Sequence, residues 1–125
     1  SWWHYLRGVL ATAAGDFAAA GAAYEQALAA AVDDLARARF LLARLSSVLK
    51  GTGELSDANL ATLRQNVEQN RGRSTGYRFA ELYAAALYAR GQSDAAVRFL
   101  QEQLQALPAQ ERAVSDTFRL ALGLI

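Results

Sequence analysis

The feature that most constrains the fold is a helical hairpin at residues 8–34, whose punctuation returns later in the chain. A helix-forming run ends at a Gly-Asp pair, and a second alanine-rich run follows it. The motif GDFAAA at residues 15–20 recurs as GQSDAA at residues 91–96, 76 residues later. A glycine turn with a small residue at a fixed distance is typical of a hairpin that is used more than once. The sequence therefore predicts antiparallel helical hairpins stacked on one another.

The composition also favours a fold made of helices. Hydrophobic residues make up 53% of the 125 residues, and many are alanine, the best helix former. Pro108 is the only proline, so little interrupts a helix. We expect an all-α fold of about seven helices in a single domain over residues 1–125.

The spacing of apolar residues and the capping residues place these helices. We expect them at residues 2–14, 17–32, 35–50, from 56 to a polar break at 71–75, 75–90, from 93 to 108, and 109–124. Residues 51–55 are expected to form a loop, and Ser93 to cap the sixth helix. The helices group into hairpins over about 2–33, 35–71 and 75–107, with a terminal helix over about 109–124.

Apolar residues follow helical spacing in the first expected helix. They are Trp2, Trp3, Leu6, Val9, Leu10 and Ala13. The tryptophan pair allows two interpretations. Its rings pack on the second helix or on a preceding repeat, or they are exposed at an interface with a missing domain or a second copy.

The first hairpin resembles the tetratricopeptide repeat (TPR), a helix-turn-helix unit of about 34 residues. The agreeing residues are Gly8, Gly15, Asp16, Phe17, Ala20, Tyr24, Ala27 and Leu28. The third hairpin agrees at Gly91, Ala96, Leu104 and Pro108 and departs at Leu100 and Gln103, and the middle hairpin is assigned by spacing alone. The resemblance implies a right-handed TPR-like α-solenoid, with the first helix of each repeat lining a concave groove.

The same resemblance implies a protein-interaction module, with a peptide or a partner domain in the groove. The implied peptide-binding residues are Tyr5, Val9, Arg39, Phe40, Arg78, Glu81, Leu82 and Tyr88. Tyrosine and arginine are favoured anchors at interfaces. For Phe40 and Leu82 the alternative is packing between helices. Some family members hold a C-terminal carboxylate with a lysine-and-asparagine clamp, which this chain lacks.

The residue chemistry argues against other functions. A net charge of +1 gives no electrostatic basis for binding nucleic acid, and no apolar run reaches the ~20 residues of a membrane span. One histidine, His4, and no cysteine leave no familiar zinc site. Asp33-Asp34 is typical of a helix start, and Ser46-Ser47 has no neighbouring base. We expect no catalytic residue, no metal and no cofactor.

Two alternatives remain. The third hairpin is similar to repeats that trail bacterial zinc metallopeptidases, which makes the chain an accessory, substrate-recruiting tail of a larger enzyme. The Trp2-Trp3 end and the terminal helix also fit a self-assembly domain, so a homo-oligomer stays open. The chain reads as a soluble protein of either the cytoplasm or the periplasm, and as a fragment of a longer product.

Overall fold

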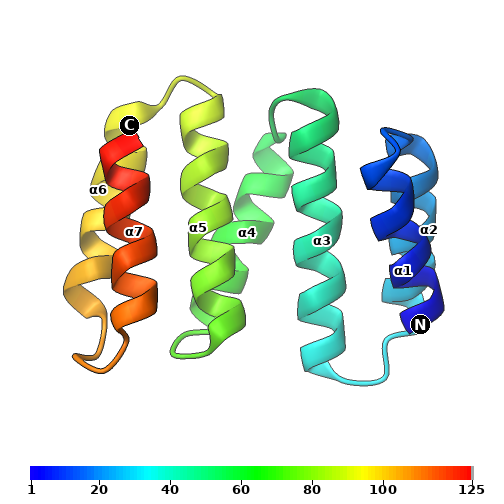
Figure 1. Cartoon of the computed structure of the whole chain (residues 1–125), viewed down its shortest axis with the longest axis horizontal. Coiled ribbons are helices and arrows are strands. Elements are labelled where there is room, and N and C mark those ends of the chain that lie inside the picture. The colour runs from blue at the N-terminus through cyan, green and yellow to red at the C-terminus, as the bar shows by residue number, and fades with distance from the viewer. Residues whose placement is uncertain (125) are drawn as a thin grey trace. The chain divides into compact units, whose positions relative to one another are not determined.

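The computed structural model describes residues 1–124, and within them every regular element is a helix (Figure 1). The prediction of an all-α fold with seven helices is confirmed. The helices are α1 (Trp2–Ala13), α2 (Phe17–Ala29), α3 (Asp34–Thr52), α4 (Asp57–Gln69), α5 (Ser74–Ala89), α6 (Ser93–Ala106) and α7 (Arg112–Leu124). They form two compact units, unit 1 (Ser1–Asn59) and unit 2 (Leu60–Ile125), with the boundary inside the first turn of α4.

A glycine turn closes the α1–α2 hairpin. Gly15 has a φ of +78°, a left-handed conformation that glycine adopts without strain. Its N–H donates to the carbonyl oxygen of Thr12 (3.0 Å), and the N–H of Asp16 donates to that of Ala11 (2.9 Å). This pair of bonds satisfies the last carbonyl groups of α1 and ends the helix.

The α5–α6 hairpin repeats this turn. Gly91 also has a φ of +78°. Its N–H donates to the carbonyl oxygen of Tyr88 (2.9 Å), and the N–H of Gln92 donates to the carbonyl oxygen of Leu87 (2.9 Å). Each donor and acceptor lies 76 positions after its counterpart in the first hairpin. The sequence repeat is therefore also a repeat of backbone geometry.

Small residues bring α1 and α2 together. A Cβ atom on Gly8 would lie 2.6 Å from Cδ1 of Tyr24, so the tyrosine ring fills the place of the missing side chain. Ala20 and Ala27 of α2 are fully buried. Of the residues of α2 that carry the TPR resemblance, Ala20, Tyr24 and Ala27 are buried and Leu28 is half-buried, and the ring of Tyr24 packs within its own hairpin.

Helix α3 packs against α2 and also contacts α1. Phe40 is fully buried with Ala27 and Ala36, and Tyr5 lies against this cluster. The hydroxyl oxygens of Thr12 and Ser47 are 3.0 Å apart. A polar pair therefore joins α1 to α3 beside the apolar core of unit 1.

In unit 2, α6 contacts both α5 and α7. The end of α4 approaches α5 so closely that a Cβ atom on Gly76 would lie 2.7 Å from the carbonyl carbon of Asn70. The Thr75 hydroxyl donates to Oδ1 of the buried Asn70 (3.3 Å), whose Nδ2 donates to the carbonyl oxygen of Asn66 (2.9 Å). The polar break predicted at 71–75 is thus an ordered corner.

Four boundary predictions were wrong. Helix α2 ends at Ala29 because the chain must extend to present Asp33, the N-cap of α3. Helix α3 continues to Thr52, since the left-handed residue that ends it is Gly53 (φ +83°). Ser93 is the first residue of α6, and Gln92 takes the N-cap position.

The fourth error concerns α7, which begins at Arg112 and not at Ala109. Leu107 is extended, as residues before proline prefer, and the N–H of Glu111 donates to the carbonyl oxygen of Pro108 (3.0 Å). This turn delays the start of the helix.

Candidate peptide-binding site

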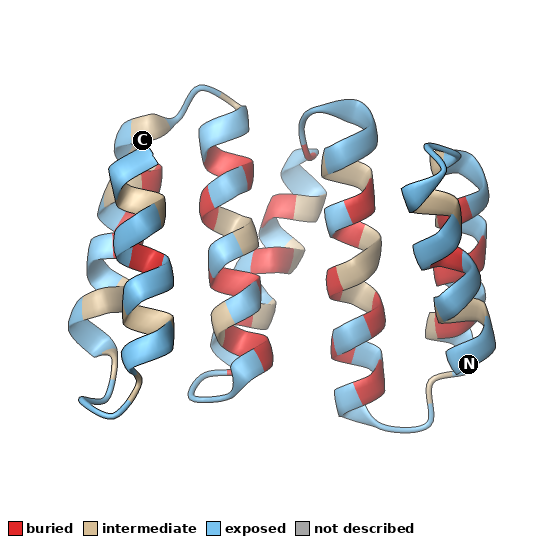
Figure 2. Cartoon of the chain, viewed as in Figure 1, coloured by how far each residue is buried: buried red, intermediate tan, exposed pale blue. Residues whose placement is uncertain are grey.

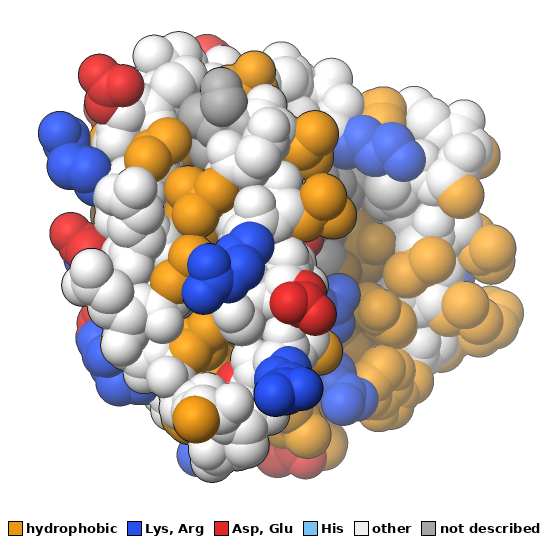
Figure 3. Space-filling view, turned by 60° about the vertical axis from the view of Figure 1, so that its left-hand side comes forward, with side chains coloured by type: hydrophobic (Ala, Val, Ile, Leu, Met, Phe, Trp, Pro, Cys, Tyr) orange, Lys and Arg blue, Asp and Glu red, His pale blue; other side chains and the backbone are white. Residues whose placement is uncertain are grey.

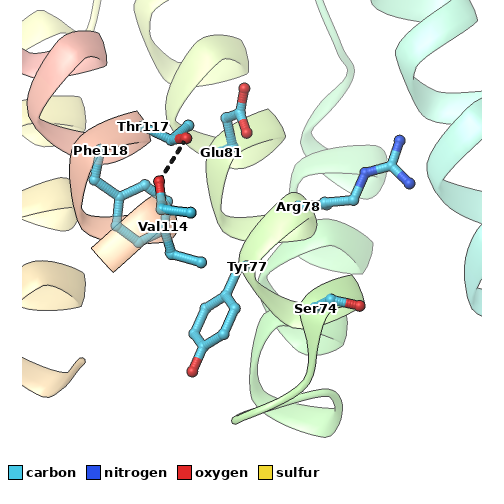
Figure 4. Close-up of a pocket in the computed structure, with 8 residues that line it drawn as sticks. Ser74, Tyr77, Arg78, Glu81, Val114, Thr117 and Phe118 are labelled. Carbon is cyan, nitrogen blue, oxygen red and sulfur yellow. Dashed lines mark hydrogen bonds between the residues drawn. The ribbon is translucent and has the colours of Figure 1, made fainter. Parts of the chain in front are cut away.

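A pocket of about 200 Å³ lies between α5 and α7 in unit 2 (Figure 4). Its lining residues are Ser74, Tyr77, Arg78, Glu81, Ala113, Val114, Thr117 and Phe118. Two of them, Arg78 and Glu81, belong to the predicted peptide-binding set. The structure therefore places part of that set at a recess in the surface.

The centre of this pocket is apolar and its edge is polar. Val114 and Phe118 extend from α7 towards α5, and Tyr77 of α5 lies across from them (Figure 4). Arg78 and Glu81 are exposed and extend away from this apolar group. A guest side chain can thus be held by apolar contact while its neighbours meet one cation and one anion.

The pocket is small for a cofactor and large enough for a side chain. Sites for drug-sized ligands have volumes of ~300–1,000 Å³, whereas a cavity of ~150 Å³ holds benzene. The pocket of about 200 Å³ matches one leucine or phenylalanine side chain. Its size favours the recognition of a polypeptide over that of a small molecule.

The other predicted residues lie in varied surroundings. In unit 1, Phe40 is fully buried, and the centre of its ring is 5.3 Å from that of Tyr5, which is half-buried. Phe40 therefore packs between helices, the alternative given for it above. Val9 and Arg39 are exposed.

In unit 2, Tyr88 is exposed and Leu82 is half-buried, both on α5. Neither lines the pocket. Arg78 and Glu81 are thus the only predicted residues of α5 that do so.

Six of the eight lining residues are not in the predicted peptide-binding set: Ser74, Tyr77, Ala113, Val114, Thr117 and Phe118. The family resemblance assigns no contact to Val114 or Phe118, because both lie on the terminal helix, outside the three hairpins. The signal that was present is their spacing of four, which puts both on one face of α7. The sequence alone does not reveal that this face leaves a gap against α5.

A second feature of the surface is the α1 outer face, which we define as Trp2, Trp3, Leu6, Val9 and Leu10. These side chains are between 38% and 68% exposed, although their spacing is that of a buried stripe. The two tryptophans differ: Trp3 is 68% exposed, whereas the half-exposed Trp2 places its ring edge-on to the buried Phe40 of α3, with 5.2 Å between the ring centres. Figure 2 shows most of α1 as exposed, and Figure 3 shows that hydrophobic side chains reach the surface of the chain.

The α4–α5 corner carries two exposed arginines, Arg71 and Arg73. Arg71 forms an ion pair with Glu68, and its hydrogen bond lowers the pKa of that carboxyl below its usual range. The same contact raises the pKa of the Arg71 guanidinium. Arg71 is therefore already engaged with a carboxylate of its own corner.

The remaining side chains offer little chemistry. Among residues 1–124, no three histidine, cysteine, aspartate or glutamate side chains gather where they could hold a metal ion. None of the described helices has the length and apolarity needed to cross a membrane.

The chain matches no protein-family model, and no curated protein or solved structure resembles it significantly.

Proposed function

We propose that the chain is a protein-interaction module of the TPR-like solenoid kind that binds a peptide segment of a partner protein. The observation that carries the proposal is the pocket between α5 and α7, which combines apolar walls with Arg78 and Glu81. Burial of an apolar anchor in such a recess, surrounded by polar residues, is the usual source of affinity in protein interfaces. The pocket is the anchor site, and the charged pair selects the neighbouring residues.

Unit 1 supports the TPR-like assignment. Gly8 and Tyr24 are in contact, and Ala20 and Ala27 are fully buried, as the resemblance requires of small residues at a helix crossing. Helix α3 packs against both helices of the first hairpin. The recurrence of the glycine turn at Gly91 extends the same pattern to unit 2.

The peptide should present a leucine or phenylalanine with charged neighbours. Arg78 lies one turn before Glu81 on α5 and favours an acidic residue near it, while Glu81 favours a basic one. An extended segment with an acidic and a basic residue beside the anchor would pair with both Arg78 and Glu81. Selection of a displayed peptide library on the purified chain should enrich this pattern.

Two variants test the site with the selected peptides. Thr117→Trp fills the pocket from an exposed position, and we expect at least a tenfold loss of affinity, measured by titration calorimetry. Arg78→Glu should weaken binding about tenfold and shift the selected charge from acidic to basic. Arg98→Glu is the control, because it reverses the charge of an exposed arginine on α6 outside the pocket. It should change neither the affinity nor the charge of the selected peptides. Equal binding by Thr117→Trp and the unmodified chain would reject the pocket, and a library without enrichment would reject peptide binding.

A further inference from the structure

Helix α1 is held in place without any partner bound to the α1 outer face. The opposite side of the helix is held by contacts of Gly8 with Tyr24, of Tyr5 with Phe40 and of Thr12 with Ser47. These contacts fix α1, and the Trp2 ring adds an edge-on contact with Phe40, while more than a third of each side chain of the α1 outer face stays in water. Exposed apolar groups of this size on a rigid element are typical of a docking surface.

From this arrangement we infer that the α1 outer face docks an amphipathic helix of a partner protein, with a carboxylate beside the apolar stripe of that helix. The inference stands apart from the pocket of unit 2. Its residues follow spacings of three and four, so they form one stripe along the helix. From Trp2 to Leu10 the stripe spans nine residues and is about 13 Å long, which two to three turns of a partner helix would cover.

The charge of this region identifies the partner's chemistry. Residues 1–32 contain only three charged side chains, those of Arg7, Asp16 and Glu25. Asp16 caps α2 by accepting from the N–H of Ala19, and Glu25 lies 3.9 Å from the guanidinium of Arg44.

Arg7 is the charge that borders the α1 outer face. It follows Leu6, about 100° round the helix. The Nη1 atom of Arg7 lies 3.5 Å from Nδ1 of His4, and among the described residues Arg7 pairs with no carboxylate. An apolar stripe bordered by a cation without an acidic partner complements an apolar helix with an acidic flank.

The area indicates a reversible complex. Covering five large side chains at these exposures removes on the order of 500 Å² from this partner and a similar area from the other, near the lower end of specific interfaces, ~1,200 Å². Such contacts belong to regulatory and transient partners more often than to permanent ones. Micromolar affinity is expected.

A second copy of the chain fits this face less well. In a two-fold antiparallel pair of helices, each flank meets the same flank of the other copy. Arg7 lies next to the midpoint of α1, so the two guanidinium groups would come side by side. Placing like charges opposite each other disfavours that pairing.

The test uses the full chain and two synthetic helical probes of four turns without tryptophan. Both probes carry the same leucine stripe, with glutamates on the flanks of the acidic probe and lysines on those of the basic one. Trp2 and Trp3 are the only tryptophans of the chain, so intrinsic fluorescence reports on this face directly. We expect the acidic probe to bind at least tenfold more tightly than the basic one, with a blue shift of the emission.

Three variants complete the test. Leu10→Gln should weaken the acidic probe at least tenfold, whereas Leu120→Gln on α7, an equally exposed leucine, should leave it unchanged. Arg7→Glu should reverse the preference between the probes. Circular dichroism should show that all three variants keep their helices.

Three results would overturn the inference. They are the absence of probe binding, equal binding of both probes, and an unchanged affinity in Leu10→Gln. Light scattering distinguishes a homodimer from a complex with a partner helix. If the chain self-associates, becomes monomeric on Leu10→Gln and binds neither probe, the α1 outer face pairs with a second copy of the chain.

Discussion

At the scale of single residues, the contact between Gly8 and Tyr24 sets the approach of α1 to α2. A Cβ atom on Gly8 would meet the buried tyrosine ring at 2.6 Å, so Gly8→Ala should force the ring or the helix to move. Overpacking of this kind costs about 1–3 kcal/mol, which exceeds the gain of up to ~1 kcal/mol from replacing a helical glycine. We expect a net loss of free energy of unfolding, measured by urea denaturation.

Gly21→Ala is the matched control, since Gly21 is also helical but has open space around the position of its Cβ atom. This change should stabilise the chain by about 0.5–1 kcal/mol. The two substitutions are chemically identical, so opposite signs would attribute the difference to Tyr24. Equal effects would show that the ring gives way at no cost.

At the scale of helices, the sequence predicted the number of elements and several faces correctly. Spacings of three and four put Ala20, Ala23, Tyr24 and Ala27 on one face of α2, and all four are buried. The same reasoning does not orient α1, whose apolar residues exceed what its inner face can hold. Packing around Gly8 decided which side turns inward, and the larger side chains were left outside. Periodicity cannot distinguish a core stripe from a docking stripe when both are apolar.

The candidate site was predictable only in part, for a related reason. Arg78 and Glu81 were found because the family resemblance assigns their face of α5 to the groove. The pocket itself depends on how closely α7 approaches α5, and α7 begins three residues later than its sequence indicates.

Helix α4 is tied to α5 and α6 by a cation over two rings. The Arg64 guanidinium carbon lies 5.0 Å from the ring centre of Phe99 and 5.6 Å from that of Tyr83, and the two rings meet edge-on. Arg64→Gln should lower the free energy of unfolding by about 0.5–1 kcal/mol. In a Tyr83→Leu background, Arg64→Gln should lower the free energy of unfolding by less. Arg98→Gln on α6 should not change that free energy measurably. Additive effects in this double-mutant cycle would remove the ring contact as the cause.

The corner between α4 and α5 should be less tolerant than the α1–α2 contact. At Gly76 the atoms in the way belong to the backbone of Asn70 and cannot rotate aside as a ring can. Gly76→Ala should therefore destabilise the chain by at least about 2 kcal/mol. Gly123→Ala on α7, with open space at its Cβ position, serves as the control in thermal melts. A melting temperature equal to that of the control would show that the corner can open without loss.

At the scale of the whole molecule, charges are few and the net charge is +1, so a small number of groups should govern stability against pH. Burial of Tyr24 raises the pKa of its phenol above 10.0, although a hydrogen bond with Thr12 opposes the rise. The folded chain thus holds this proton more tightly than the unfolded chain does. The resulting stabilisation is complete below pH 10 and is lost as the pH rises through the higher folded pKa.

Denaturation as a function of pH tests this reasoning. The free energy of unfolding of the unmodified chain should fall above pH 10, and Tyr24→Phe should flatten that decline because no buried phenol remains to ionise. Below pH 9 the variant should be slightly less stable, since it loses the hydrogen bond with Thr12. Tyr88→Phe, at a tyrosine that is half exposed, should keep the slope of the unmodified chain. If Tyr24→Phe and Tyr88→Phe lose stability in parallel above pH 10, alkaline unfolding comes from the remaining charges and not from the tyrosine beneath Gly8.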